Sequence, residues 1–325
     1  MLAAQSTSSP IIDQMAIATF NLTKQFDRQV AVSDVELQVQ SGEVYGLIGP
    51  NGAGKTTLIR MLATAEEPTL GEIYIHGDRL LRDDSNPHLK QRLGYLPDDF
   101  PLYDDLNVWD YLDYFARLYN LHQPRRRRRL SEVLELVQLT HKRDDKIATL
   151  SRGMKQRLSL ARTIIHEPLL LLLDEPVSGL DPIARMQFRE IIKVLQEAGM
   201  TILISSHVLS DLAELCSSVG IMELGYLVES TSLEDLYQRL SRQYLVVSTL
   251  DNLDGLVGEL KQQPLVRSWE SCAPNRLQVE FAGTPAESTA LLKDLIAAGI
   301  PVSEFYGKTE DLESIFLKLG HQQTT

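Results

Sequence analysis

The sequence predicts an α/β protein with a mainly parallel sheet, followed by a smaller α+β domain. Short apolar segments alternate with helix-period segments, a pattern typical of strands and helices joined by crossovers. Residues 169–173 are a continuous run of leucines, which suits a parallel strand buried on both faces. After residue 240 the order strand, helix, strand, strand, helix, strand predicts a ferredoxin-like domain. We therefore expect a flexible tail at 1–14, a main domain at 15–240 with a helical part at about 95–165, and an accessory domain at 241–325.

Local periodicity and turn residues place the individual elements. Strands are expected at 15–20, 30–32, 35–39, 43–48, 72–77, 169–173 and 201–206. Helices are expected at 57–62 and 154–165, with a helical insertion over about 109–145 and a turn at 68–71. In the accessory domain we expect strands at 244–250, 266–271, 277–281 and 302–306, and helices at 253–261, 285–298 and 311–319.

The most specific motif is the loop that follows the strand at 43–48. It reads G-x-x-x-x-G-K-[ST] and consists of Gly49, Pro50, Asn51, Gly52, Ala53, Gly54, Lys55 and Thr56, with Thr57 next in the helix. Glycines let successive backbone N–H groups turn toward a phosphate, and the helix N-terminus adds its positive dipole end. The Lys55 ammonium suits the β- and γ-phosphates, and the Thr56 hydroxyl suits Mg²⁺. The loop therefore predicts the phosphate site of a nucleotide hydrolase.

The leucine run at 169–173 ends in two carboxylates, Asp174 and Glu175. At the tip of a strand beside the phosphate loop, Asp174 would hold Mg²⁺ directly or through water. Glu175 would polarise the attacking water as a general base, an effect of about 10²–10⁴-fold. The pair therefore predicts metal-assisted hydrolysis of the bound nucleotide.

The order of further motifs resembles the ATP-binding subunit of ATP-binding cassette (ABC) transporters over roughly residues 15–230. Residues 150–156 look like the family signature, 178–181 like its D-loop, and 205–207 like the segment that carries its switch histidine. The resemblance implies a P-loop NTPase fold, with ATP and Mg²⁺ bound between two subunits. It implies contact of Ser151, Arg152 and Gly153 with the γ-phosphate held by the other subunit, a dimer role for Asp181, a γ-phosphate contact for His207, and stacking of Phe26 on adenine. Ser151 and the Gly153 amide also precede an expected helix, which predicts an anion site.

Two residues depart from the family pattern. Arg152 stands in place of the first signature glycine, and it keeps a positive charge near the phosphates. Asp98 stands where the family usually has a glutamine that contacts Mg²⁺ or the lytic water and links the site to the membrane partner. Asp98 is expected to bind Mg²⁺ as a charged ligand. Lys55, Asp174 and Glu175 remain, so we expect an active ATPase.

Composition limits the partners of the chain. A net charge of −12 and a pI of about 5.1 oppose nucleic-acid binding, and two distant cysteines suggest no disulfide framework or metal site. No apolar run is long enough to span a bilayer. The family resemblance implies a cytoplasmic protein at the membrane's inner face that powers a separate permease as a homodimer or heterodimer. Residues 310–317 resemble the tail of ATP-binding subunits of drug-resistance and polysaccharide exporters, which implies export. Three roles stay open for this tail: support of the dimer, regulation, or structural capping.

Several alternatives stay open at this stage. The five arginines at 125–129 fit a solvated helix start, an acidic lipid or partner surface, or nucleic acid. Two other functions fit the fold: a soluble ATPase that acts on ribosomes or nucleic acid, and a non-catalytic ATP-sensing module. The single cassette without heptads opposes the first, and the presence of Glu175 and His207 opposes the second.

Overall fold

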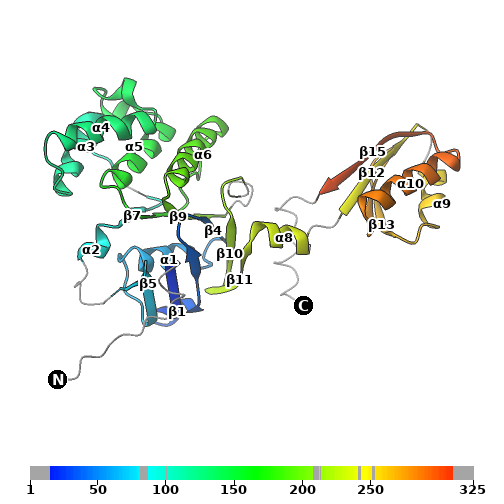
Figure 1. The fold of residues 1–325 in the computed structure, drawn as a ribbon, viewed down its shortest axis with the longest axis horizontal. Coiled ribbons are helices and arrows are strands. Elements are labelled where there is room, and N and C mark those ends of the chain that lie inside the picture. Colours follow the sequence, from blue (N-terminus) through cyan, green and yellow to red (C-terminus); the bar gives the residue numbers. More distant parts are fainter. Residues whose placement is uncertain are drawn as a thin grey trace. The chain divides into compact units, whose positions relative to one another are not determined.

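The structure is a computed structural model that describes residues 15–80, 87–99, 101–207, 212, 214–240, 243–250 and 253–309. It divides into two compact units, Met1–Leu233 and Glu234–Thr325 (Figure 1). The expected tail at 1–14, the expected helix at 311–319 and the exporter-like ending at 310–317 lie outside the described residues. None of the described helices is long and apolar enough to cross a membrane.

A six-stranded sheet forms the centre of the first unit, in the order β11-β10-β4-β9-β8-β7. All neighbours are parallel except the pair β10 and β11. The strands are β4 (Val44–Ile48), β7 (Leu93–Leu96), β8 (Leu170–Leu173), β9 (Thr201–Ser206), β10 (Ser218–Glu223) and β11 (Tyr226–Ser232). Every residue of β4, β8 and β9 is buried, as expected for strands covered on both faces. The predicted α/β class is confirmed.

A smaller antiparallel sheet packs beside it. Its strands are β1 (Met15–Phe26), β2 (Gln29–Val35), β3 (Gln38–Gln40), β5 (Leu70–Ile75) and β6 (Asp78–Arg79). Two expectations were wrong here. The strand expected at 35–39 is divided between β2 and β3, and residues 70 and 71 belong to β5 because Leu70 pairs with Thr23 of β1.

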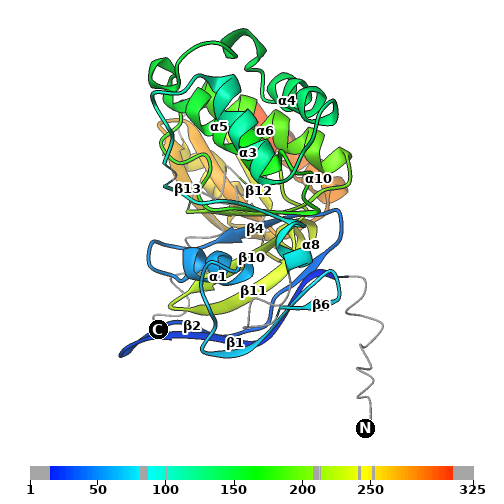
Figure 2. The same cartoon turned by 90° about the vertical axis from the view of Figure 1, so that its left-hand side faces the viewer.

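Helices cover both faces of the parallel sheet (Figure 2). Helix α1 (Lys55–Leu62) contacts β2 and β8 and so lies between the two sheets. The opposite face carries α5 (Arg152–Ile164) and α6 (Pro182–Glu197). Helices α3 (Val108–Leu118) and α4 (Arg125–Leu136) pack on each other and on α5, and α2 (Pro87–Lys90) is a single turn. The helical insertion predicted over about 109–145 therefore contains α3 and α4, and α5 corresponds to the helix predicted at 154–165.

The second unit has its own sheet and core. Its elements are α8 (Leu233–Leu240), β12 (Gln243–Thr249), α9 (Leu253–Leu260), β13 (Val266–Ala273), β14 (Arg276–Phe281), α10 (Pro285–Ala297) and β15 (Val302–Thr309). The strand order β13-β14-β12-β15, with antiparallel neighbours throughout, inserts β14 between the two strands joined by α9. This split arrangement is the ferredoxin-like topology that the segment order predicts. Apolar residues of α9 and α10 cover the sheet and include Leu256, Leu260, Leu291 and Leu295.

Candidate active site

The carboxyl ends of adjacent parallel strands bring the predicted polar residues together. Strand β4 leads into the loop at Gly49, β7 precedes Asp98, β8 ends before Asp174 and Glu175, and β9 ends before His207. Because these strands are neighbours and parallel, their ends meet at one edge of the sheet. Ligands of α/β folds bind at this edge. The topology thus gathers residues that are far apart in the sequence.

The phosphate loop has the backbone that only glycine tolerates well. Gly54 has φ +102°, and a Cβ added there would lie 2.3 Å from the Ala31 carbonyl oxygen. Helix α1 begins at Lys55, whose side chain is buried within the loop. The Lys55 ammonium donates hydrogen bonds to the Gly49 oxygen at 2.7 Å and the Pro50 oxygen at 3.2 Å. Backbone carbonyl groups of the loop therefore hold the Lys55 ammonium in place.

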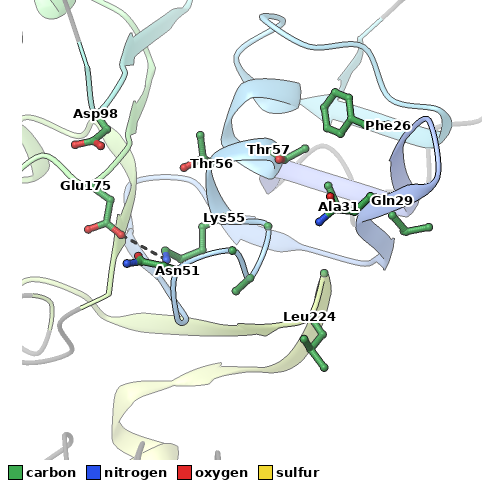
Figure 3. Close-up of a pocket in the computed structure, with 15 residues that line it drawn as sticks. Phe26, Gln29, Ala31, Asn51, Lys55, Thr56, Thr57, Asp98, Glu175 and Leu224 are labelled. Atoms are coloured by element: carbon green, nitrogen blue, oxygen red, sulfur yellow. Dashed lines mark ion pairs between the residues drawn. The ribbon is translucent and has the colours of Figure 1, made fainter.

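The Glu175 carboxylate lies between the side chains of Lys55 and His207, the two residues predicted to contact phosphate. One of its oxygens is 3.4 Å from Lys55 Nζ (Figure 3), and the other is 2.7 Å from His207 Nδ1. Its backbone has φ +48°, which is uncommon for a residue with a side chain and directs the chain sharply away from β8. The carboxylate, the ammonium and the imidazole thus form one connected group.

Ser205, which the sequence reasoning missed, bonds the Asp174 carboxylate and the Glu175 backbone. Its hydroxyl is fully buried, donates to Asp174 Oδ1 at 2.8 Å, and accepts from the Glu175 amide at 2.9 Å. A polar residue near the end of an otherwise apolar strand was the signal that could have identified it. The hydroxyl takes the place of a backbone partner where the β8–β9 ladder ends at Leu173 and Ile204.

Asp174 has the features of a cation ligand. Its side chain is buried, and its Oδ2 atom has no hydrogen-bond partner among the described residues. Burial raises the pKa of this carboxyl, and hydrogen bonds from Ser205 and Thr56 oppose that rise. A buried acceptor without a donor is costly unless a ligand satisfies it. The Asp174 oxygen beside the Thr56 hydroxyl therefore fits Mg²⁺.

A cleft of about 480 Å³ runs from the carboxylates of Asp98 and Glu175 to the aromatic ring of Phe26, and Asp174 does not line it. The predicted residues that line it are Phe26, Asn51, Gly52, Ala53, Gly54, Lys55, Thr56, Thr57, Asp98 and Glu175. Figure 3 shows Asp98 and Glu175 on one side of the phosphate loop, and Phe26, Gln29 and Ala31 on the other. Phe26 is 44% exposed, and Lys24 Nζ lies 4.7 Å from its ring centre. Leu224, 88% exposed in the turn after β10, also lines the cleft and was missed in the sequence.

Asp98 lies at the acidic end. Partial burial raises the pKa of its carboxyl, and the charges of Glu175 and Asp99 raise it further. Asp98 lines this cleft and also a second cavity of about 490 Å³ that Arg152 and Lys155 share. The residue therefore connects the two cavities.

The signature and D-loop residues lie apart from the cleft of their own subunit. Helix α5 begins at Arg152, so Gly153 lies within its first turn and does not precede it as expected. Ser151 caps this helix by accepting from the Met154 amide at 3.3 Å, and Asp181 caps α6 by accepting from the Ala184 amide at 2.9 Å. A Cβ added to Gly153 would lie 2.7 Å from the Ala184 Cβ, so this glycine permits close packing of α5 and α6.

Known proteins resemble this chain over nearly its whole length. The ABC transporter family model matches residues 32–178. An uncharacterised ABC transporter ATP-binding protein of Bacillus subtilis, YxlF, is 34% identical over 301 residues, which cover 93% of this chain and 98% of the relative. The chain belongs to the ABC transporter ATP-binding proteins. The bacitracin transport ATP-binding protein BcrA of Bacillus licheniformis is also 34% identical, with 93% of this chain and 96% of the relative covered.

Solved ABC structures share the fold of this ABC ATPase. The structure of an ATP-binding subunit of an ABC transporter has a TM-score of 0.62 and 31% identity, and covers 69% of this chain and 92% of its own. The protein cbiO1 of Clostridium perfringens has a TM-score of 0.63 at 23% identity, covers 70% of this chain and 94% of its own, and supports the fold alone. The predicted family, P-loop NTPase fold and ATPase activity are confirmed.

The arginine run of this ABC ATPase is largely engaged within the subunit. Arg126 Nε lies 2.7 Å from Asp113 Oδ1, and Arg128 Nε lies 2.9 Å from Glu132 Oε1. Arg125 pairs with Glu167, and Arg129 Nη2 donates to the Ile164 carbonyl oxygen at 2.8 Å. These partners favour a structural role in the helical part over a lipid or nucleic-acid surface.

Proposed function

We propose that this ABC ATPase hydrolyses Mg²⁺–ATP in sites shared by two subunits and thereby powers a separate membrane-spanning permease. The observation that carries the proposal is the convergence of Lys55, Thr56, Asp174, Glu175 and His207 at one sheet edge beside an aromatic-ended cleft. Triphosphate and adenine would extend along this cleft, with Phe26 stacking on the base. The chain's own residues supply a cation, a metal ligand, a base and an imidazole.

The ion pairs of Glu175 suggest the order of events. Lys55 and His207 both face the Glu175 carboxylate. The triphosphate carries more negative charge, so it would draw the ammonium and the imidazole toward itself. Glu175 would then be free to accept a proton from the attacking water, and the fixed charges would stabilise the transferring phosphoryl group.

Asp174 and Thr56 are the residues that would hold Mg²⁺. The buried Oδ2 of Asp174 and the adjacent Thr56 hydroxyl are suited to this ion. When bound, Mg²⁺ neutralises charge on the phosphates. Asp98, beside Glu175, would add a third oxygen ligand or carry the link to the permease.

Transport, direction and dimer form are the finer parts of the proposal. The relatives BcrA and LnrL, the latter 30% identical over 92% of this chain, are named for bacitracin transport and linearmycin resistance. Those names support an exporter at the cytoplasmic face of the membrane. Ser151 and Gly153 would complete the ATP site of a second subunit, either a copy of this chain or a related one, with Arg152 between them in the same segment, and Asp181 would lie at the interface. Their position outside the cleft of their own subunit supports this arrangement.

Replacing Glu175 by glutamine tests the proposal. Glu175→Gln keeps the shape of the side chain and removes the base, so hydrolysis should fall at least about 100-fold while ATP still binds. The uncleaved nucleotide should also hold two subunits together, because it contacts both. The measurements are steady-state ATPase rate, nucleotide titration and light scattering with Mg²⁺–ATP.

The matched control is Glu197→Gln, which makes the same change at an exposed position in the last turn of α6. It should hydrolyse ATP at the wild-type rate. A Glu175→Gln protein that hydrolyses ATP as fast as this control would show that another group acts as the base. A variant that binds ATP but stays monomeric would contradict the shared site.

A further inference from the structure

Arg152 points back onto its own subunit. It is the first residue of α5, and its Nη2 donates a hydrogen bond to the Ser178 carbonyl oxygen at 3.0 Å. A Cβ added to Gly179 would lie 2.7 Å from the guanidinium carbon and from both terminal nitrogens. The planar guanidinium therefore lies directly against the Gly179 backbone, in a place that a side chain at 179 would occupy.

The segment that Arg152 contacts comes directly after the base. The Ser178 amide donates to the backbone carbonyl oxygen of Glu175 at 3.1 Å. Ser178 therefore links the Arg152 side chain to the backbone of Glu175. Gly179 has φ +66°, a left-handed conformation suited to a residue without a side chain. Three residues further on, Pro182 begins α6. One arginine thus connects the start of α5 to the loop between the base and α6.

The surroundings of Arg152 make this contact specific. The first turns of α5 and α6 are in close contact through Gly153, next to Arg152 in the sequence, and Ala184. Asp98 and Asp99 line the cavity next to it, and the Arg152 charge lowers the pKa of Asp98 against the effect of burial. The guanidinium nevertheless bonds a backbone carbonyl. A lysine has no planar fork to lie against Gly179.

We propose that Arg152 is a positioning residue that clamps the D-loop, residues 178–181, to the signature segment of the same subunit. The functional consequence rests on the proposed shared site: two elements that would face the partner's nucleotide move as one unit. The clamp also explains why an arginine at position 152, in place of the family glycine, is useful to this protein. It differs from a role in which the Arg152 charge reaches the partner's phosphate directly.

The direct test uses the full chain without nucleotide and measures amide hydrogen exchange of the peptide over residues 176–181. Arg152→Ala and Arg152→Lys should both exchange several-fold faster than wild type, because both lose the contact with Ser178 and Gly179. Lys155→Ala is the matched control, since it removes a charge one turn along α5 that pairs with Asp104. It should leave this peptide unchanged. Wild-type exchange in Arg152→Ala would overturn the clamp.

The functional test compares ATPase rates of the same variants. Both Arg152→Ala and Arg152→Lys should lose about tenfold in kcat, the loss expected for one charge-assisted hydrogen bond, with nucleotide affinity of the isolated subunit unchanged. Full activity of Arg152→Lys, with its guanidinium contact to Ser178 and Gly179 lost, would overturn the clamp. That result would not bear on the base, which Glu175→Gln tests separately.

Discussion

Ser205 joins Asp174 and the backbone of Glu175 through one hydroxyl. Because the hydroxyl accepts a hydrogen bond from the Glu175 amide, its single proton is free to be donated to Asp174. Burial makes the arrangement stringent, since a partner left without a hydrogen bond costs about 1–3 kcal/mol. One buried hydroxyl therefore orients the Asp174 carboxylate and holds the backbone of Glu175.

We predict that Ser205→Ala lowers kcat by about tenfold with little change in the KM for ATP, because the phosphate loop does not depend on this hydroxyl. The apparent requirement for Mg²⁺ should rise, since Asp174 loses the donor that orients it. Steady-state kinetics across an Mg²⁺ titration measure both effects. Ser205→Thr keeps the hydroxyl and should restore most of the rate. Equal rates for wild type and Ser205→Ala at every Mg²⁺ concentration would contradict this role.

At the scale of elements, close contact between α5 and α6 sets the positions of the signature and the D-loop. Gly153 and Ala184 allow the two helices to approach until a Cβ at 153 would be only 2.7 Å from its neighbour. Asp181 and Pro182 then begin α6, a start signal from which this helix could have been predicted. Small residues at this crossing thus serve packing as well as any contact with nucleotide.

We predict that Gly153→Ala destabilises the first unit by about 1–3 kcal/mol, the usual effect of overfilling a packed contact. Alanine ordinarily favours a helix over glycine, so a loss of stability would identify the crowding as the cause. Thermal unfolding measures the change. Adding Ala184→Gly should recover part of the loss by restoring the space. An unfolding midpoint at or above that of wild type would contradict the prediction.

At the scale of the whole molecule, each compact unit has a separate apolar core. The described residues that line the nucleotide cleft all fall between Phe26 and Gly225, within the first unit. The core of the second unit contains only residues of that unit, from Leu245 to Phe305. The described lining of this cleft therefore contains no residue of the second unit.

We predict that a chain ending at residue 240 binds ATP within about twofold of the full-length affinity, because every described cleft residue remains. Titration with a fluorescent nucleotide measures this, and circular dichroism verifies that the shortened chain is folded. Any loss of dimer formation or of stimulation by a permease would then assign those functions to the accessory domain. A folded chain whose affinity falls more than tenfold would show that the second unit supports the cleft.

The sequence by itself determined the phosphate loop, the two carboxylates after the leucine run and the alternation of strands and helices. These are local features: a turn that needs glycine, a fully buried strand and the repeat of apolar residues depend on neighbours along the chain. The same local signals were enough for the ferredoxin-like order of the second unit. They were not enough for the start of β5, which pairing between Leu70 and Thr23 decides.

Only the tertiary structure decided which groups meet across strands and helices. Ser205 reaches Asp174 because β9 lies beside β8, and Arg152 reaches Ser178 because α5 packs against α6. The arginine run reads as a block of charge in the sequence, but Asp113 and Glu167, which lie outside its helix, pair with it in space. Hydrogen bonds and ion pairs act over a few ångströms in space, so partners distant in sequence are fixed by strand order and helix packing.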